Sequence, residues 1–267
     1  MVLENPDNGL RLLAISVGNT RTSFGVFEGD LLARADSAPN ADEPALLAAL
    51  LKEARSIEGA ELRAVVAATV NPEFSERLIE SLEKELDAPV RRVERDLPVA
   101  IEHSLGDHHT TGQDRLLAAL AAFEGLKQAC VVVDAGTAIT VDFVDGTGVF
   151  HGGVIAPGVQ MMLDSLASGA SALPRLDASA PGTSEPYAKT TPDAMRAGVL
   201  AAARGLVRTM LDAYSENYGA YPAVIATGGD AETLFRDDDI VETIVPHLVL
   251  RGLAVSVKRA LQTDDDD

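Results

Sequence analysis

Two apolar hairpin patterns with a glycine–threonine turn constrain this chain most strongly. The first turn, residues 17–20 (Val-Gly-Asn-Thr), follows the apolar run 10–16, and the second, residues 135–137 (Ala-Gly-Thr), follows the apolar run 129–134. A glycine-containing turn between two apolar runs is typical of a β-hairpin. Because the pattern begins again in the second half of the chain, the sequence predicts two similar lobes.

Helical patterns follow each hairpin, which predicts an α/β fold class. Apolar residues recur at helical spacing over residues 43–54, after Asn71-Pro72, and over the long segments 191–214 and 247–261. We place the boundary after residue 127, so that residues 1–127 form an N-terminal lobe and residues 128–267 a C-terminal lobe. Two lobes with facing phosphate turns would enclose a nucleotide cleft.

Composition excludes some classes of partner. The formal net charge is −19, aromatic residues make up 4% of the chain and tryptophan is absent. This charge repels nucleic-acid phosphates and anionic lipids, and few rings are present to stack on bases, so we expect no nucleic-acid or membrane partner. The single cysteine, Cys130, fits a reducing compartment, and the polar first ten residues lack a secretory pattern. We therefore expect a cytoplasmic protein.

Both glycine–threonine turns have the chemistry of phosphate-binding loops. Glycine lets a backbone approach a phosphate closely, and successive N–H groups in a turn can bind an anion. Asp134 ends an apolar run directly before the second turn, where a carboxylate can hold a cation beside phosphates. Each turn alone has an ordinary structural interpretation, but two in matching positions favour nucleotide phosphate binding.

Residues 112–115 (Gly-Gln-Asp-Arg) begin a predicted helix that runs to about residue 128. An acidic residue there stabilises a helix through the helix dipole, which is one interpretation of Asp114. Alternatively, Asp114 accepts a proton from a substrate hydroxyl, while Arg115 binds a carboxylate or phosphate through two hydrogen bonds. The spacing alone does not separate these interpretations.

The order of five motifs resembles the type III pantothenate kinase family over about residues 11–260. The motifs are Val-Gly-Asn-Thr-Arg-Thr, Gly-Gln-Asp-Arg, Asp-Ala-Gly-Thr-Ala-Ile-Thr-Val-Asp, Phe-His-Gly-Gly-Val-Ile-Ala-Pro-Gly and Thr-Gly-Gly-Asp. The resemblance implies two ribonuclease-H-like lobes of the actin type and a homodimer. It also implies transfer of the ATP γ-phosphate to pantothenate, which gives 4'-phosphopantothenate for coenzyme A synthesis, with Mg²⁺ and a monovalent cation (K⁺ or NH₄⁺).

The resemblance also assigns roles to single residues. Asp114 would be the catalytic proton acceptor, Asp134 would bind the monovalent cation, and Thr137 would contact ATP. Pantothenate would bind Gly112, Gln113, Asp114, Arg115 and Thr191. The ATP phosphates would be wrapped by Ser16, Val17, Gly18, Asn19, Thr20, Arg21, Thr22 and Ser23.

The sequence departs from the family pattern at two places. Ser16 stands where the family has an aspartate that helps to organise Mg²⁺, and Ile101 lies near the position of a family tyrosine, before a longer loop over residues 105–111. Loss of the aspartate favours a nucleotide-binding regulator without turnover, since the family has relatives once described as accessory factors for toxin gene expression. The altered loop favours a kinase for another small hydroxylated acid. We therefore keep both alternatives beside the pantothenate kinase.

Overall fold

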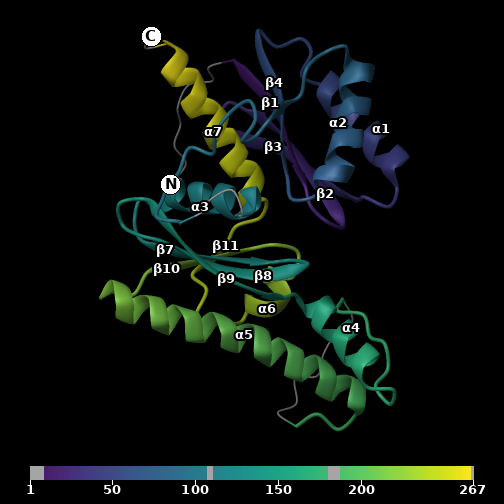
Figure 1. The fold of residues 1–267 in the computed structure, drawn as a ribbon, viewed down its shortest axis with the longest axis vertical. Coiled ribbons are helices and arrows are strands. Elements are labelled where there is room, and N and C mark those ends of the chain that lie inside the picture. The colour runs from purple at the N-terminus through teal and green to yellow at the C-terminus, as the bar shows by residue number, and fades with distance from the viewer. Residues whose placement is uncertain (1–8, 107–110, 180–186, 266–267) are drawn as a thin grey trace. The chain divides into compact units, whose positions relative to one another are not determined.

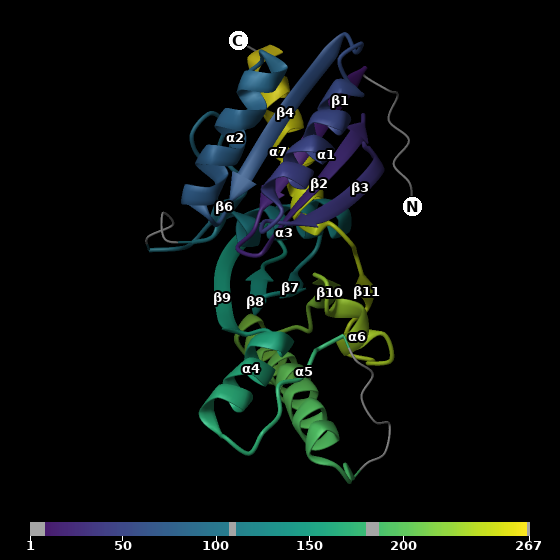
Figure 2. The ribbon, with the colours of Figure 1, turned by 90° about the vertical axis from the view of Figure 1, so that its right-hand side faces the viewer.

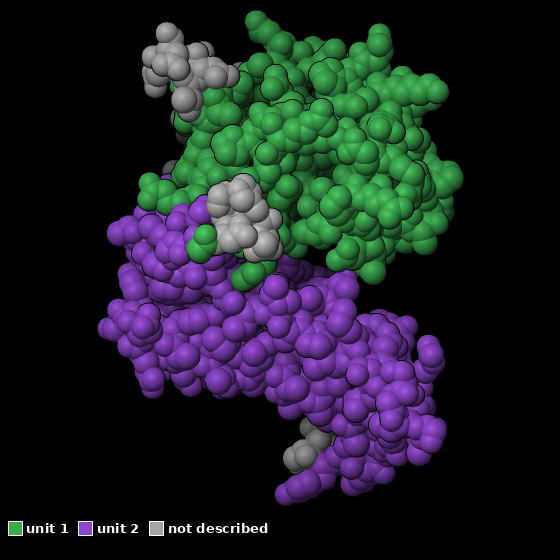
Figure 3. Space-filling model, in the orientation of Figure 1, with its two compact units in different colours: residues 1–102, 106–125, 247–267 green, residues 103–105, 126–246 purple. Residues whose placement is uncertain are grey.

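The chain forms two compact units in a computed structural model that describes residues 9–106, 111–179 and 187–265. Unit 1 comprises residues 1–102, 106–125 and 247–267, and unit 2 comprises residues 103–105 and 126–246 (Figure 3). The predicted C-terminal lobe includes residues 247–267, whereas in the structure these residues belong to unit 1. The division at residue 127 itself stays a prediction.

Unit 1 is built on a five-stranded sheet in the order β3-β2-β1-β4-β5. β1 pairs antiparallel with β2 and parallel with β4, so the hairpin predicted around the first turn is confirmed. The elements of this unit are β1 (Leu10–Val17), β2 (Arg21–Glu28), β3 (Leu31–Pro39), α1 (Glu43–Arg55), β4 (Leu62–Thr69), α2 (Pro72–Leu86), β5 (Arg91–Arg92), α3 (Gln113–Leu126) and α7 (Leu248–Asp265).

Helices cover both faces of the unit 1 sheet, with α1 and α2 on one side and α7 on the other (Figures 1 and 2). Because side chains alternate along a strand, Leu13 and Ile15 of β1 pack with α1 and α2. On α7, buried apolar residues recur at helical spacing along one stripe. This stripe includes Leu250, Leu253, Ala254 and Val257.

Unit 2 is built on a six-stranded sheet in the order β11-β10-β7-β8-β9-β6. β7 pairs antiparallel with β8 and parallel with β10, which confirms the second predicted hairpin. The elements are β6 (Glu102–His103, at the boundary between the units), β7 (Cys130–Ala135), β8 (Ala138–Val144), β9 (Val149–Pro157), α4 (Val159–Gly169), α5 (Thr191–Tyr218), β10 (Ala223–Thr227), α6 (Ala231–Phe235) and β11 (Thr243–Ile244).

The long helix α5 packs one stripe of side chains against the unit 2 sheet. Its buried residues recur every four positions, so they follow one face of the helix. They are Met195, Val199, Ala203, Val207, Leu211 and Ser215. Val133 of β7 and Val141 of β8 belong to the same apolar core. Among the described residues, no helix combines the length and apolar character that crossing a membrane requires.

Thr190 caps α5, since its Oγ1 accepts a hydrogen bond from the Asp193 N–H (3.3 Å). The predicted end of this helix at residue 214 is wrong, because the helix continues to Tyr218. Gly219 ends it in the left-handed conformation (φ 81°), which glycine adopts without a steric cost.

Gly252 of α7 lies directly against the backbone of α3. A Cβ placed there would overlap the carbonyl group of Leu117, and this contact has no flexible side-chain atom that can move aside. Gly252→Ala should therefore push α7 from α3 and lower the free energy of unfolding by about 1–3 kcal/mol. Urea denaturation measures this change.

Gly125→Ala is the matched control, because Gly125 lies on α3 with open space around its Cα. This substitution should raise the free energy of unfolding by about 0.5–1 kcal/mol through helix propensity alone. Equal effects of the two substitutions would contradict the described packing of α7 on α3.

The β8–β9 turn is held by the carboxylate of Asp145. It accepts hydrogen bonds from the N–H and hydroxyl of Thr147 (2.8 and 2.7 Å), the N–H of Val149 (3.1 Å) and Nε2 of His151 (2.8 Å). Burial alone would raise the pKa of Asp145, but these hydrogen bonds, led by that of His151, hold it well below its ordinary value. Since the carboxylate only accepts, Nε2 of His151 carries a proton, and Nδ1 lies within hydrogen-bond distance of the Ser104 hydroxyl (3.0 Å).

A lowered pKa in the folded state means that ionised Asp145 stabilises the protein above the ordinary carboxyl pKa. This stability is lost as the pH falls through the folded-state value. Asp145→Asn should therefore be less stable than the wild type at pH 7, and the difference should shrink as the pH falls from about 4 towards 2. Thermal unfolding across this pH range measures the difference in stability. Asp237→Asn is the control, because Asp237 is an exposed aspartate. A difference that does not change with pH would contradict this account.

Candidate active-site elements

The first glycine–threonine turn joins β1 to β2 in unit 1. The N–H of Gly18 donates to the carbonyl of Arg21 (3.0 Å). A Cβ on Gly18 would lie 2.8 Å from that carbonyl oxygen, which is closer than real side chains approach, so the turn requires glycine. Glycine at this position lets the two ends of the turn approach each other closely.

Asn40, just after β3, is hydrogen bonded to three carbonyl groups of this turn. Its Nδ2 donates to the carbonyls of Gly18 (2.8 Å) and Asn19 (3.3 Å), and its backbone N–H donates to that of Thr20 (2.9 Å). Its Oδ1 accepts from the buried hydroxyl of Thr22 (2.8 Å). The conformation of the turn thus depends on a residue about twenty positions away.

Ser16, Arg21 and Ser23 lie around the base of the turn. Ser16 and Ser23 are paired neighbours on β1 and β2, and both are half-buried. The guanidinium of Arg21 instead donates to Ser37 of β3, at 2.8 Å to the carbonyl and 2.9 Å to the hydroxyl. Arg21 is therefore engaged within the sheet, and its predicted contact with phosphate stays a prediction.

Residues 112–115 form the N-terminus of α3. The side-chain Oε1 of Gln113 accepts from the backbone N–H of Thr69 at the end of β4 (3.0 Å), and its Nε2 donates to the carbonyl of Val93 (3.3 Å). Both ends of the amide are therefore bound to backbone. This arrangement gives Gln113 a positioning role, while its predicted contact with substrate stays a prediction.

Asp114 is half-buried and folds back over the start of its helix. Its Oδ1 accepts from the N–H of Arg115 (2.9 Å), and a Cβ on Gly112 would lie 2.5 Å from the same oxygen. Burial raises the pKa of Asp114 above its ordinary value, although the hydrogen bond and charge of Arg115 oppose the shift. A raised carboxyl pKa is the property that a general base requires, because it strengthens the affinity for a proton.

The turn and the α3 motif meet at one edge of the unit 1 sheet. Val17 at the end of β1 is the register partner of Thr69 at the end of the parallel strand β4, and the N–H of Val70 donates to the carbonyl of Val17 (3.0 Å). Gln113 attaches α3 to the same Thr69. Parallel strands in α/β folds place ligand sites beyond their carboxyl ends, so this edge suits a bound substrate.

The second turn is in unit 2 and joins β7 to β8. The N–H of Gly136 donates to the carbonyl of Ala138 (3.0 Å), and the N–H of Gly158 donates to that of Thr137 (3.0 Å). Asp134 is half-buried near the end of β7, opposite Thr140 of β8 and Thr227 of β10. Thr137 is exposed at the tip, where it can reach a ligand.

Two further glycines pack against the second turn. A Cβ on Gly158 would overlap the carbonyls of Gly136 and Thr137, and one on Gly228 (φ 94°) would overlap Ala135 and lie 2.5 Å from Oδ1 of Asp134. Substitution at either position would push the backbone away from the turn. Gly158 and Gly228 belong to two of the family motifs given above, and both therefore pack closely around the second turn.

The donor set around the second turn fits a cation. Asp134 offers a carboxylate beside threonine and backbone oxygens, and both Mg²⁺ and K⁺ are bound through such oxygen ligands. Among the described residues, no group of three or more histidine, cysteine, aspartate or glutamate side chains gathers to hold a metal by itself. A cation here would therefore depend on the phosphates for its remaining ligands.

Thr191 lies in unit 2 as the first residue of α5 and is exposed. Its neighbour Thr190 forms the helix cap and donates to Oδ2 of Asp193 (2.6 Å). Thr191 therefore does not cap α5, and its assignment to pantothenate binding stays a prediction.

At the edge of the unit 1 sheet that bears the first turn, the sequence analysis missed two residues, Asn40 and Thr69. Neither lies in a glycine motif, and each acts through a partner distant in sequence, so the only available signal was a polar residue directly after, or at the end of, a predicted strand. The link between Gln113 and Thr69 spans 44 positions and has no local signature.

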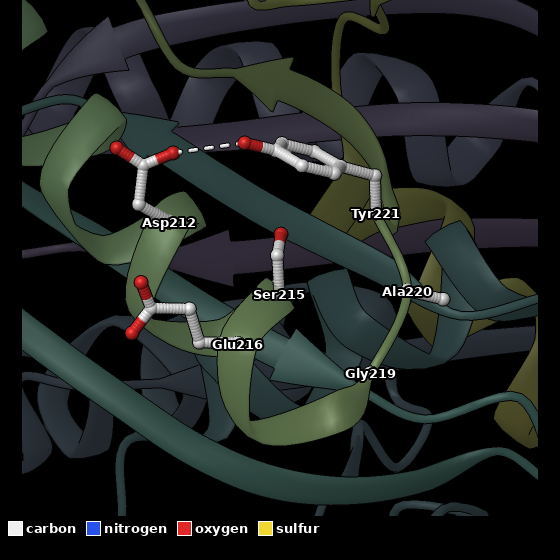
Figure 4. A pocket seen from close by; sticks show the side chains of 6 residues that line it. All are labelled: Asp212, Ser215, Glu216, Gly219, Ala220 and Tyr221. Carbon is white, nitrogen blue, oxygen red and sulfur yellow. Dashed lines mark hydrogen bonds between the residues drawn. The ribbon is translucent and has the colours of Figure 1, made fainter.

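A pocket of about 410 Å³ at the C-terminal end of α5 contains none of the predicted site residues. Figure 4 shows that it is lined by Asp212, Ser215, Glu216, Gly219, Ala220 and Tyr221. The hydroxyl of Tyr221 donates to Asp212 (3.1 Å), and this bond raises the pKa of the tyrosine. The acidic pocket would repel a phosphate, so we do not assign the nucleotide to it.

Solved structures with similar folds support the α/β architecture. A Baf family transcriptional activator from Campylobacter jejuni has a TM-score of 0.60 and 20% identity, over 94% of this chain and 99% of that one. An activator of 2-hydroxyisocaproyl-CoA dehydratase from Clostridium difficile, solved with bound ADPNP, has a TM-score of 0.55 and 12% identity, over 96% and 98%. These similarities confirm the predicted fold class of two actin-like α/β lobes.

Relatives at higher identity bear the family name. Type III pantothenate kinases from Frankia alni and Rhodospirillum rubrum are each 34% identical, over 91% and 93% of this chain and 96% and 98% of their own lengths. One from Syntrophus aciditrophicus is 33% identical over 93% of this chain and 99% of its own. The profile of the family described as type III pantothenate kinase matches residues 12–213. The chain therefore belongs to the type III pantothenate kinase family.

Proposed function

We propose that this protein phosphorylates pantothenate with ATP, which gives 4'-phosphopantothenate and ADP in the synthesis of coenzyme A. The observation that carries the proposal is Asp114, a half-buried carboxylate whose pKa is raised, at the sheet edge that also bears the first phosphate turn. Family membership supports pantothenate as the acceptor.

Asp114 accepts the proton of the substrate hydroxyl in this mechanism. As the proton moves to the carboxylate, the hydroxyl oxygen forms a bond to the γ-phosphorus of ATP. The bond between that phosphorus and the oxygen bridging to the β-phosphate breaks, and ADP leaves with the electron pair. The attachment of Gln113 to Thr69 and Val93 fixes the start of α3 and so fixes the position of Asp114.

Arg115 binds the pantothenate carboxylate, since a guanidinium matches a carboxylate with two parallel hydrogen bonds. The backbone N–H groups of residues 17–20 bind ATP phosphates, and Thr137 adds a hydroxyl contact. Thr191 completes the pantothenate site. In a chain with a net charge of −19, such local donors must overcome the repulsion of two anionic substrates.

The proposal also covers the bound cations, the oligomeric state and the cellular location. Asp134 binds K⁺ or NH₄⁺ near the phosphates, and Mg²⁺ supplies charge neutralisation for the transferred group. The protein acts as a homodimer in the cytoplasm. The half-buried carboxylate of Asp134 supports the cation assignment, and the single, buried cysteine fits a reducing compartment.

Asp114→Asn should strongly lower kcat, because the amide cannot accept the hydroxyl proton. A loss of about 10²–10⁴-fold in kcat is expected for a general base, with KM for ATP little changed. An ADP-release assay with pantothenate, ATP, Mg²⁺ and K⁺ measures it. Full activity of Asp114→Asn would rule out its role as the base.

The pH dependence of the wild type tests the same residue. Because the base must be ionised and burial raises its pKa, kcat/KM should fall on the acid side at a higher pH than an ordinary carboxyl of pKa about 4 would give. A profile measured from pH 4 to 8 shows where the fall begins. A fall centred at or below the ordinary value would contradict the burial argument.

Ser16→Asp should restore the charge that the family pattern has at this position. The new carboxylate can hold a Mg²⁺-bound water beside the phosphates, so the apparent Mg²⁺ affinity or kcat should rise several-fold. Titration of activity with Mg²⁺ measures this, with Ser16→Asn as the uncharged control. If Ser16→Asp is neutral or harmful, our account of Ser16 is wrong.

A second candidate function is a nucleotide-binding regulator without turnover, which the serine at position 16 favours. ATP binding without ADP release from the wild type, in the presence of pantothenate and both cations, would support this candidate over the kinase. ADP release with a different small hydroxylated acid would instead support a changed substrate, as the altered loop before Gly112 favours.

A further inference from the structure

We propose that Asn40 is a positioning residue that sets the phosphate-binding conformation of the first turn. The inference rests on the proposal that residues 17–20 bind the phosphates of ATP. Asn40 lies outside every motif that assigned this site, directly after β3, and its half-buried side chain contacts the turn from the β3 side.

The geometry follows from the planarity of the peptide unit. In a trans peptide the C=O and the following N–H point in opposite directions, and none of the peptides among the described residues is cis. The carbonyl of Gly18 points to Nδ2 of Asn40 and the carbonyl of Thr20 points to its backbone N–H. The N–H groups of Asn19 and Arg21 must therefore point away from Asn40.

Two N–H groups held on one side of a short turn form the kind of concave donor set that binds anions. Nothing in the local sequence forces this arrangement, because a turn of this length can rotate its peptide units. The carboxamide of Asn40 fixes it, since only its NH₂ end can donate to the carbonyls of Gly18 and Asn19 while its oxygen accepts from Thr22.

The buried hydroxyl of Thr22 holds Asn40 in the correct orientation. This hydroxyl is fully buried and donates to Oδ1 of Asn40 at 2.8 Å, which prevents the carboxamide from turning over. The chain of bonds from Thr22 through Asn40 to Gly18 thus connects a buried residue of β2 with the phosphate side of the turn. Its function is to keep the turn ready for the anion before ATP arrives.

Two substitutions separate this role from simple electrostatic effects. Asn40→Asp keeps the shape and the acceptor for Thr22 but replaces the NH₂ donors with a charged oxygen that repels the turn carbonyls. Asn40→Ala removes the donors without adding charge. We expect Asn40→Ala to weaken Mg·ATP binding about tenfold, because it removes two hydrogen bonds from the turn. Asn40→Asp removes the same two bonds and adds a repulsive charge, so it should weaken Mg·ATP binding further.

The experiment titrates each folded variant of the full chain with Mg·ATP in the absence of pantothenate. Ser37→Ala is the matched control, since Ser37 lies three residues earlier and contacts Arg21 but no carbonyl of the turn. It should bind within about twofold of the wild type, a change within the scatter of surface substitutions. Steady-state kinetics should show KM for ATP raised in the Asn40 variants while KM for pantothenate is unchanged.

The outcomes distinguish this inference from the proposed function. Lowered thermal stability with unchanged Mg·ATP binding would make Asn40 merely structural and would overturn the inference. Normal binding by Asn40→Ala with weak binding by Asn40→Asp would assign the effect to charge and would also overturn it. A wild type that binds Mg·ATP but does not phosphorylate pantothenate would refute the proposed function and leave the Asn40 result standing.

Discussion

The parallel pairing of β1 with β4 is the constraint on which the proposed site in unit 1 depends. Val17 and Thr69 are register partners at the carboxyl ends of these strands, so the phosphate turn after β1 and the segment after β4 begin at the same edge. Gln113 then hydrogen bonds to Thr69 and brings the start of α3 to that edge. The proposed base and the proposed phosphate donors therefore owe their proximity to backbone register, with side chains adding the final orientation.

The sequence predicted this architecture well where the signal was local. Apolar runs on either side of glycine turns identified both hairpins, and the capping pair Asn71-Pro72 identified the start of α2, where Asn71 does accept from the N–H of Phe74. Contacts between distant residues were not predictable, because Asn40 and Thr69 have no local pattern that reveals their partners. The end of α5 was missed because the residues directly after Tyr214 are polar, although they continue the helix until Gly219 ends it.

The two glycine–threonine turns now differ in their proposed chemistry. The second retains Asp134 before the turn and is surrounded by Gly158 and Gly228, which allow backbone to approach where side chains would collide. The first has Ser16 in the matching place, but it has an organised backbone whose carbonyls face Asn40. Loss of a carboxylate at one turn leaves an uncharged donor set there, so the charge needed to stabilise the transferred phosphate must come from elsewhere.

The central claim is that the γ-phosphate reaches the hydroxyl of pantothenate rather than water. ³¹P NMR of the wild-type protein with ATP, Mg²⁺, K⁺ and pantothenate measures this directly, because a phosphate monoester and inorganic phosphate give separate resonances. The account predicts a monoester signal that grows in step with ADP and requires pantothenate. Inorganic phosphate as the only product, or no consumption of ATP at all, would contradict it.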